Sequence, residues 1–223
     1  MSIPKKVFVS YKYSDVVEGR EDKFNFRDEL IDKLGGEGFR HKGEDDESFD
    51  LSDYNREQIV SKIAPDIKNS SLTIVLITPN AKYSKWIPWE ISLSLRERTY
   101  ETEKNMTRNG IIGLYLPLNR FGIPELGGSY DFYISKQSCG TTTHHTNKFP
   151  KMIEDNTFNL KNGFHKCSQG CHDKVYDSYE GSFIELIKWD DFINDIDSCI
   201  ERAWNRRNNF ENYNPRINLV NGE

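Results

Sequence analysis

Leu72-Thr73-Ile74-Val75-Leu76-Ile77 is the segment of the sequence that most clearly has the pattern of a buried strand. It is continuously apolar and rich in β-branched side chains, as is typical of a parallel strand covered on both faces. Thr78-Pro79-Asn80 follows as a turn signal, and we expect a helix after it that carries Trp86, Glu90 and Leu95. This stretch therefore predicts a strand, turn and helix of an α/β domain.

Similar units flank this stretch on both sides. Further strands are expected at residues 6–10, 111–116 and 182–189, with an edge strand or long loop in 39–50. Helices are expected from about Asp22 to Gly35, from Ser52 or Asp53 with a kink or end at Pro65, and after Asp190 or Asp191. Strands that alternate with helices imply right-handed crossovers. We predict an α/β, doubly wound, flavodoxin-like fold with a mostly parallel five-stranded sheet.

The remaining sequence is organised around this sheet. Residues 117–181 lack strong periodicity and are expected to form a long irregular insertion between the fourth and fifth strands. The tail 208–223 is polar and expected to be frayed. We predict a single domain that spans residues 1–223.

Composition restricts the classes of partner and compartment. The chain has 223 residues, 36% of them hydrophobic, and a formal net charge of -5. This acidic balance argues against nucleic-acid binding, which needs a Lys/Arg surplus to release counterions from phosphates. The sequence has neither a signal-peptide pattern nor an apolar run of the ~20 residues that a membrane span needs. We expect a cytoplasmic protein with no membrane partner.

Several α/β chemistries can be excluded by their missing motifs. The sequence contains no GxGxxG after the first strand, no GxxxxGK[ST] and no GxSxG. A phosphate-accepting receiver needs an Asp at the end of the third strand, where this chain has Thr78-Pro79-Asn80. Parallel sheets bind ligands at the carboxyl ends of their strands, so residues 10–13 and 78–90 should surround one crevice.

The motif in this crevice resembles a known family. The pattern is Ser84-x-Trp86-x-x-x-Glu90, with Val7-Phe8-Val9-Ser10-Tyr11 at the start of the chain and residues 70–77 before it. It is similar to TIR-like domains, closest to the bacterial branch that includes the TIR-like component of Thoeris antiphage defence systems. The resemblance covers roughly the first half of the chain plus the last strand and helix, and it leaves the insertion unexplained.

The resemblance implies an enzyme of the NAD+ glycohydrolase or ADP-ribosyl cyclase type. In that family the glutamate of the motif is the catalytic residue for cleaving NAD+ at the nicotinamide–ribose bond, and Glu90 matches it. A single carboxylate suits this reaction, because cationic nicotinamide leaves without a protonating acid and the charge develops at the anomeric carbon. The product, ADP-ribose or a cyclic isomer, would act as an immune signal on a separate downstream effector. NAD+ is then the substrate, no cofactor is required, and assembly into a homo-oligomer or filament is expected.

The alternative from another class is a non-catalytic TIR-type scaffold for protein interactions. In that case Glu90 would be an ordinary glutamate of a first helical turn, and Tyr11 and Trp86 would be packing residues.

Seven residues are candidates for substrate binding. On one helix, Tyr83 and Trp86 would share a face with Glu90 and form an aromatic wall. However, Pro88 removes a helical hydrogen bond, so residues 84–87 can instead form a separate turn before a helix that begins at Pro88. The complete set of candidates is Ser10, Tyr11, Asp50, Asn55, Tyr83, Ser84 and Trp86.

The insertion contains a candidate zinc site. His165-x-Cys167-x-x-x-Cys171-His172, with Cys139, His144 and His145 upstream, offers enough thiolates and imidazoles for a tetrahedral site that would brace the loop. The ligand set that we consider is Cys139, Cys167, Cys171 and His172. The alternative is a set of unligated loop residues. Cys199, on the expected last helix, is interpreted as a core side chain.

Overall fold

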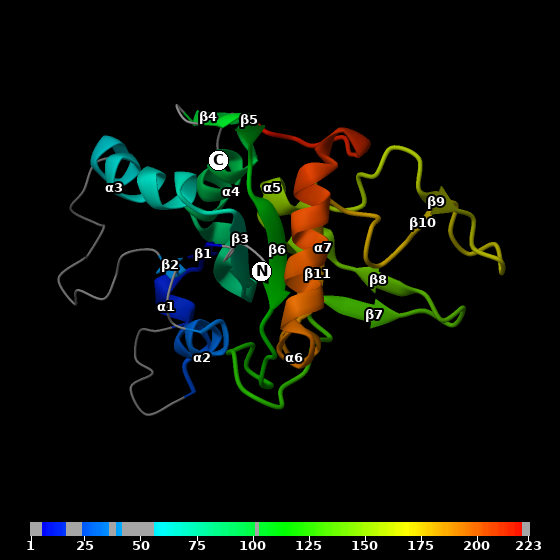
Figure 1. Ribbon diagram of the computed structural model, residues 1–223. Helices are drawn as coiled ribbons and strands as arrows, with labels where there is room; N and C mark the ends of the chain where they lie inside the picture. Colours follow the sequence, from blue (N-terminus) through cyan, green and yellow to red (C-terminus); the bar gives the residue numbers. More distant parts are fainter. Residues whose placement is uncertain (1–5, 17–23, 36–38, 42–55, 101–102, 220–223) are drawn as a thin grey trace.

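The computed structural model describes residues 6–16, 24–35, 39–41, 56–100 and 103–219 (Figure 1). Within these ranges a central sheet has five strands in the order β11-β6-β3-β1-β2, and every neighbouring pair is parallel. Its strands are β1 (Val7–Ser10), β2 (Phe39–His41), β3 (Leu72–Ile77), β6 (Gly110–Tyr115) and β11 (Ile184–Lys188). The prediction of an α/β fold with a mostly parallel sheet is confirmed, and the strand order is that of flavodoxin-like doubly wound folds.

Helices cover both faces of the sheet (Figure 1). One face packs against α2, α6 and α7 in a cluster that includes Val9, Leu30 and Ala203. The other packs against α3, α4 and α5, where Val75 and Ile91 are among the buried residues. The helices are α1 (Tyr13–Val16), α2 (Phe26–Lys33), α3 (Arg56–Lys68), α4 (Ile87–Leu95), α5 (Lys151–Glu154), α6 (Trp189–Asn194) and α7 (Ile196–Asn208), with short 3-10 helices at Pro79–Tyr83, Thr146–Lys148 and Phe210–Asn212.

Several element boundaries differ from those expected. Pro65 neither ends nor breaks α3, which continues to Lys68. The segment after β3 forms a 3-10 helix, and α4 begins only at Ile87. The last strand ends at Lys188, because Trp189 already starts α6. Asp195, with φ -149° and ψ 55°, separates α6 from α7, so the expected single last helix is two helices.

Residues 116–183 contain short elements rather than only irregular loop. A hairpin pairs β7 (Ile134–Lys136) with β8 (Thr142–His144), and a second pairs β9 (Phe164–His165) with β10 (Val175–Tyr176). Both lie to one side of the sheet, beyond α7 (Figure 1). A further hairpin, β4 (Arg98–Tyr100) with β5 (Glu103–Thr107), lies between α4 and β6. None of the described helices has both the length and the apolar character that a membrane span requires.

The prediction of a frayed tail is wrong for residues 208–219. Tyr213 is buried, and the Arg216 backbone N–H donates to Asn156 Oδ1 at 2.9 Å. Ser92 Oγ of α4 donates to the Ile217 carbonyl at 2.7 Å. These contacts hold the tail against α4 and the segment after α5. They could not be predicted from the polar composition of the tail, because they involve its backbone.

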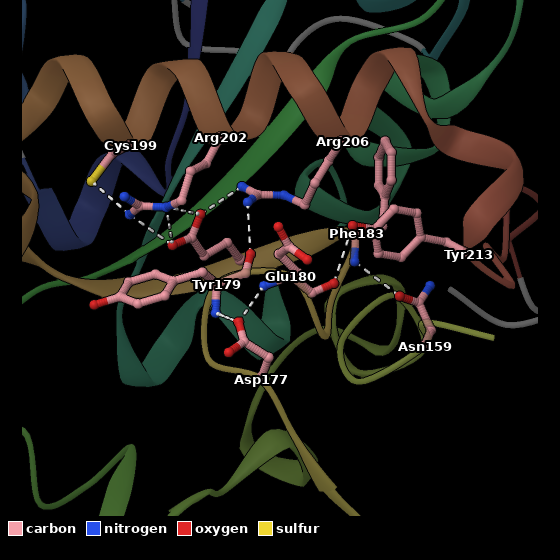
Figure 2. Close-up of polar contacts among 10 residues, drawn as sticks. Asn159, Asp177, Tyr179, Glu180, Phe183, Cys199, Arg202, Arg206 and Tyr213 are labelled. Carbon is pink, nitrogen blue, oxygen red and sulfur yellow. Dashed lines mark hydrogen bonds and ion pairs between the residues drawn. The ribbon is translucent and has the colours of Figure 1, made fainter. Parts of the chain in front are cut away.

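A buried ion-pair triad connects β11 to α7. Glu185 is 3% exposed and lies between Arg202, whose Nη2 is 2.9 Å from Oε1, and Arg206, whose Nη2 is 2.7 Å from Oε2. Figure 2 shows both guanidinium groups reaching down from α7, and Arg206 also donates to the Tyr179 carbonyl at 3.0 Å. Burial lowers the pKa of the Arg206 guanidinium, and the charge of Glu185 opposes that shift. The triad therefore joins the last strand, the last long helix and the end of the insertion.

Substitution of Gly110 with alanine is expected to destabilise the fold by about 1–3 kcal/mol. A Cβ at Gly110 would lie 2.3 Å from the Ala203 carbonyl oxygen, so the backbone of α7 would have to move away from β6. Gly113→Ala is the matched control, because the nearest atoms to its Cβ belong to the side chains of Leu186, Ile77 and Ile184 and not to the backbone. Urea unfolding of both variants measures the difference. Equal losses would contradict the close approach of α7.

Candidate active site at the carboxyl edge of the sheet

The carboxylate of Glu90 lies inside the protein, at the carboxyl end of β1. Its side chain is 0% exposed, and Ser10 Oγ donates to Glu90 Oε2 at 2.5 Å. Ser10 is the last residue of β1, and Glu90 lies in the first turn of α4. Positive partial charge at a helix N-terminus stabilises a nearby anion. Glu90 thus lies at the end of α4 where the helix presents positive partial charge.

The start of α4 is set by Ser84 and Pro88. Ser84 Oγ accepts from the backbone N–H groups of Trp86 and Ile87, both at 3.2 Å. Pro88 occupies the first turn of the helix, where its missing N–H costs no intrahelical bond. Ser84 therefore binds the backbone just before α4. The helix begins at Ile87, one residue earlier than the start at Pro88 that we considered, so Ile87 belongs to the helix and not to a separate turn.

A line of buried polar contacts holds α4 on the sheet. Ser94 Oγ donates to the Glu90 carbonyl at 2.8 Å and lies 2.8 Å from Thr73 Oγ1 of β3. Asn109 Nδ2 then donates to Thr73 Oγ1 at 3.0 Å. Buried polar groups that are satisfied in this way specify one arrangement of their elements. These contacts hold the C-terminal part of α4, four residues after Glu90, on β3.

Asp15 forms a second polar centre at the same edge of the sheet. Its carboxylate accepts a hydrogen bond from Thr78 Oγ1 and another, at 3.1 Å, from Asn80 Nδ2. Thr78 and Asn80 follow β3, so these bonds connect the segments after β1 and β3. The turn signal at residues 78–80 marked these positions, but no sequence pattern indicated that Asp15 would reach them.

The structure does not form the predicted aromatic wall beside Glu90. Tyr83 ends a separate 3-10 helix and is 75% exposed, so it does not share a helix face with Glu90. Trp86 precedes α4 and packs against the cluster formed by Phe8, Ile63 and Ile67. The late start of α4 at Ile87 is the physical reason for this correction.

Tyr11 packs into the core on the face of the sheet that α2, α6 and α7 cover. Its hydroxyl accepts a hydrogen bond from Arg27 Nη1 at 3.4 Å. Tyr11 shares its cluster with Val9, whereas Ser10 contacts Glu90 of α4 on the other face of the sheet. Of these two candidates, only Ser10 is brought to Glu90. The candidates Asp50 and Asn55 lie outside the described residues.

Comparison with known protein families matches residues 8–120 to the family model described as Thoeris protein ThsB, TIR-like domain. The chain belongs to this family. The suspected resemblance to TIR-like domains is therefore confirmed. In this TIR-like chain the matched range covers β1 from Phe8 onward, then β3, α4 and β6, and it includes Ser10, Asp15 and Glu90. The two outlying hairpins, β11 and α7 lie beyond the matched range.

Three of the four cysteines of this TIR-like chain come together in the insertion. The thiol sulfurs of Cys139, Cys167 and Cys171 all lie within 4.8 Å of one another, an arrangement that could hold a metal ion. Hydrogen bonds from Thr141 and from the neighbouring thiols lower the pKa of Cys139 to about 6. His172, the fourth ligand that we considered, is not part of this group, and it is among the residues that line the adjacent cavity. Cys199 is buried in the core, as expected.

The cavity beside the thiols has a volume of about 450 Å³ and lies between the two outlying hairpins. Thr141, His144, His172, Lys174 and Tyr176 are among its lining residues. His144 Nδ1 lies 2.9 Å from the Tyr115 hydroxyl. Burial, with smaller contributions from His145 and Lys188, lowers the pKa of His144 to about 4. The imidazole is therefore neutral in the folded protein at neutral pH.

Lowering the pH is expected to destabilise the fold through His144. Its pKa is about 4 in the folded protein and about 6.5 in the unfolded chain. Between these values the unfolded chain binds more protons, so stability falls as the pH drops from about 6.5 to about 4, by at most about 3 kcal/mol. Urea unfolding at several pH values, compared with His144→Gln, isolates this contribution. An identical pH dependence in the two proteins would contradict it.

Proposed function

We propose that this TIR-like protein cleaves NAD+ at the nicotinamide–ribose bond and that Glu90 is the catalytic carboxylate. The product is ADP-ribose or a cyclic ADP-ribose isomer, which serves as an immune signal in antiphage defence. The observation that carries this proposal is the Glu90 carboxylate, hydrogen-bonded to Ser10 at the carboxyl edge of β1 in a chain of the Thoeris TIR-like family. Parallel α/β sheets bind their ligands at this edge.

The chemistry requires one anion close to the ribose. The bond between the anomeric carbon and the nicotinamide nitrogen breaks, and its electron pair leaves with nicotinamide, which becomes neutral. The Glu90 carboxylate stabilises the positive charge that develops at the anomeric carbon. A water molecule, or a nucleophilic group of the same ADP-ribose, then attacks that carbon and releases a proton. Water gives ADP-ribose, and internal attack gives a cyclic isomer.

The burial of Glu90 limits the access of a substrate to its carboxylate. The carboxylate is 0% exposed and its Oε2 accepts from Ser10, so a substrate reaches it only after a local opening. A ribose hydroxyl can replace Ser10 Oγ as the donor, since both are neutral O–H groups. We propose that assembly into a homo-oligomer or filament favours the open form, because loop closure and opening commonly gate active sites.

The reaction as written consumes NAD+ and requires no cofactor. Any metal at the three cysteines would be structural, because those cysteines belong to the outlying hairpins. The partner of the protein is a downstream effector that recognises the nucleotide product. Ser84 contributes by accepting from the backbone N–H groups of Trp86 and Ile87 at the start of α4. Asp50, Asn55, Tyr83 and Trp86 remain proposed substrate contacts in the opened site.

The second candidate function is a non-catalytic TIR-type scaffold. The observation in its favour is the same burial, because an inaccessible carboxylate that bonds to Ser10 also works as a structural link between β1 and α4. In that case the protein would bind partners through its surface and release no nicotinamide.

Nicotinamide release separates the two functions. Purified protein is incubated with NAD+ both dilute and under conditions that promote oligomers, and free nicotinamide is quantified by liquid chromatography. The mass and retention of the second product, compared with ADP-ribose and cyclic standards, identify the isomer. We expect release in the assembled form. An assembled protein that leaves NAD+ intact would support the scaffold.

A further inference from the structure

The three clustered cysteines come from the tips of two different hairpins. Cys139 lies in the turn between β7 and β8, while Cys167 and Cys171 lie in the loop between β9 and β10. Cys139 is far from the other two cysteines in the sequence, and the packing of the two hairpins brings them together. A disulfide joins two sulfurs, but here three sulfurs lie within 4.8 Å of one another.

Both loops turn sharply at a glycine next to a cysteine. Gly140 follows Cys139 with φ +84°, and Gly170 precedes Cys171 with φ +73°. Gly170 N donates to the Cys167 carbonyl at 2.9 Å, so Cys167 and Cys171 are held at the two ends of one tight turn. Glycine adopts this left-handed conformation without steric cost. The local backbone thus directs the sulfurs of each loop toward the same point.

The spacing of the sulfurs suits a thiolate-bound metal. Zn–S bonds of about 2.3 Å in a tetrahedral site place two thiolate sulfurs about 3.8 Å apart. Cys167 Sγ and Cys171 Sγ lie 3.1 Å apart, well beyond a disulfide bond, and the full group extends to 4.8 Å at most. Shifts of about 1 Å or less in these loops therefore give the geometry of a zinc site.

A metal would stabilise two hairpins that bury little of their own surface. A two-stranded hairpin is marginally stable in water unless it packs against other elements. Both residues of β9 are exposed, and those of β7, β8 and β10 are at most partly buried. A metal that joins Cys139 to Cys167 and Cys171 would connect the two hairpins and fix the walls of the cavity between them.

We propose that Cys139, Cys167 and Cys171 bind one zinc ion, which joins the β7–β8 and β9–β10 hairpins. Three thiolates occupy three of the four tetrahedral positions, and water or a side chain takes the fourth. Binding of the metal releases the thiol protons that remain. The site is structural and does not depend on NAD+ cleavage.

Retained zinc tests this proposal. The wild-type protein and four Cys→Ser variants are purified under reducing conditions with zinc, passed over a chelating resin and analysed by mass spectrometry for zinc per chain. We expect one zinc ion per chain in the wild type and in Cys199→Ser, the matched control whose thiol lies in the core. Cys139→Ser, Cys167→Ser and Cys171→Ser should each lose the retained metal. Glu90→Gln should keep it, whatever its activity.

Cobalt substitution of the wild-type protein covers the case in which a variant fails to fold. Cobalt(II) should give a thiolate-to-metal charge-transfer band and the intense visible bands of tetrahedral coordination. Wild-type protein that retains no zinc and shows no such band would overturn the proposal. Zinc retained equally by the wild type and Cys139→Ser would also overturn it, as would a Cys167–Cys171 disulfide that persists under reducing conditions.

Discussion

Replacing Glu90 with glutamine is expected to lower the rate of nicotinamide release by about 10²- to 10³-fold. Glutamine has nearly the same shape, and its amide oxygen can still accept the hydrogen bond that Ser10 Oγ donates to Glu90. The variant therefore keeps the link between β1 and α4 but loses the negative charge. Because the charge is needed only as the ribose cation develops, the loss should fall on kcat more than on KM. Initial rates of nicotinamide release at several NAD+ concentrations measure both constants.

Two controls distinguish chemistry from folding. Thermal unfolding of Glu90→Gln should remain close to that of the wild type, because the buried hydrogen bond is kept. Ser10→Ala removes the donor from Glu90 Oε2 and leaves the carboxylate charged, so it should retain far more activity than Glu90→Gln. If Glu90→Gln releases nicotinamide as fast as an active wild-type protein, another residue performs the reaction.

Breaking the buried triad is expected to have the largest effect on stability. Glu185→Gln removes the only charge that opposes Arg202 and Arg206 within the described triad, and Arg206 is just 4% exposed. Loss of one partner from a buried ion pair typically costs about 3–5 kcal/mol, because the remaining charge stays desolvated. We expect the midpoint of urea unfolding to fall accordingly. The carbonyl of Tyr179 would remain an acceptor for Arg206, which keeps the loss within this range.

A double-mutant cycle identifies the origin of that loss. Arg206→Met alone removes a guanidinium and leaves Arg202 to hold Glu185. In the double variant Glu185→Gln/Arg206→Met only Arg202 lacks its counter-charge, and water reaches its 26% exposed side chain, so this variant should be more stable than Glu185→Gln alone. If Glu185→Gln costs less than about 1 kcal/mol, the triad is not a buried charge network in solution.

The central strands could be predicted because burial on both faces leaves an unbroken apolar run. β3 was expected at residues 72–77 and occupies Leu72–Ile77. The boundary between α6 and α7 could not be predicted, because the backbone conformation of Asp195 depends on how the two helices pack. The hairpins of the insertion were missed for a related reason. Strands of two or three residues are too short to show a period in the sequence.

The candidate site could be predicted in part. The Ser84-x-Trp86-x-x-x-Glu90 motif located α4, and the end of β1 located Ser10, since both follow from local patterns. Sequence periodicity placed Tyr83 beside Glu90, but the actual helix start at Ile87 separates them. The contacts of Asp15 with Thr78 and Asn80 depend on the conformations of two turns. Likewise, only the packing of the hairpins shows which cysteines meet and that His172 lines the cavity.

The last described residues of the chain are attached to α4, so their position can affect the position of the Glu90 carboxylate. Ser92, which holds the Ile217 carbonyl, is two residues from Glu90 on the same rigid helix. Residues 214–219 could be displaced by a fusion partner, a bound protein or a neighbouring subunit. Their displacement would weaken the packing of α4, the helix that carries Glu90. We therefore expect displacement of these residues to change the position of Glu90 without any contact with the nucleotide.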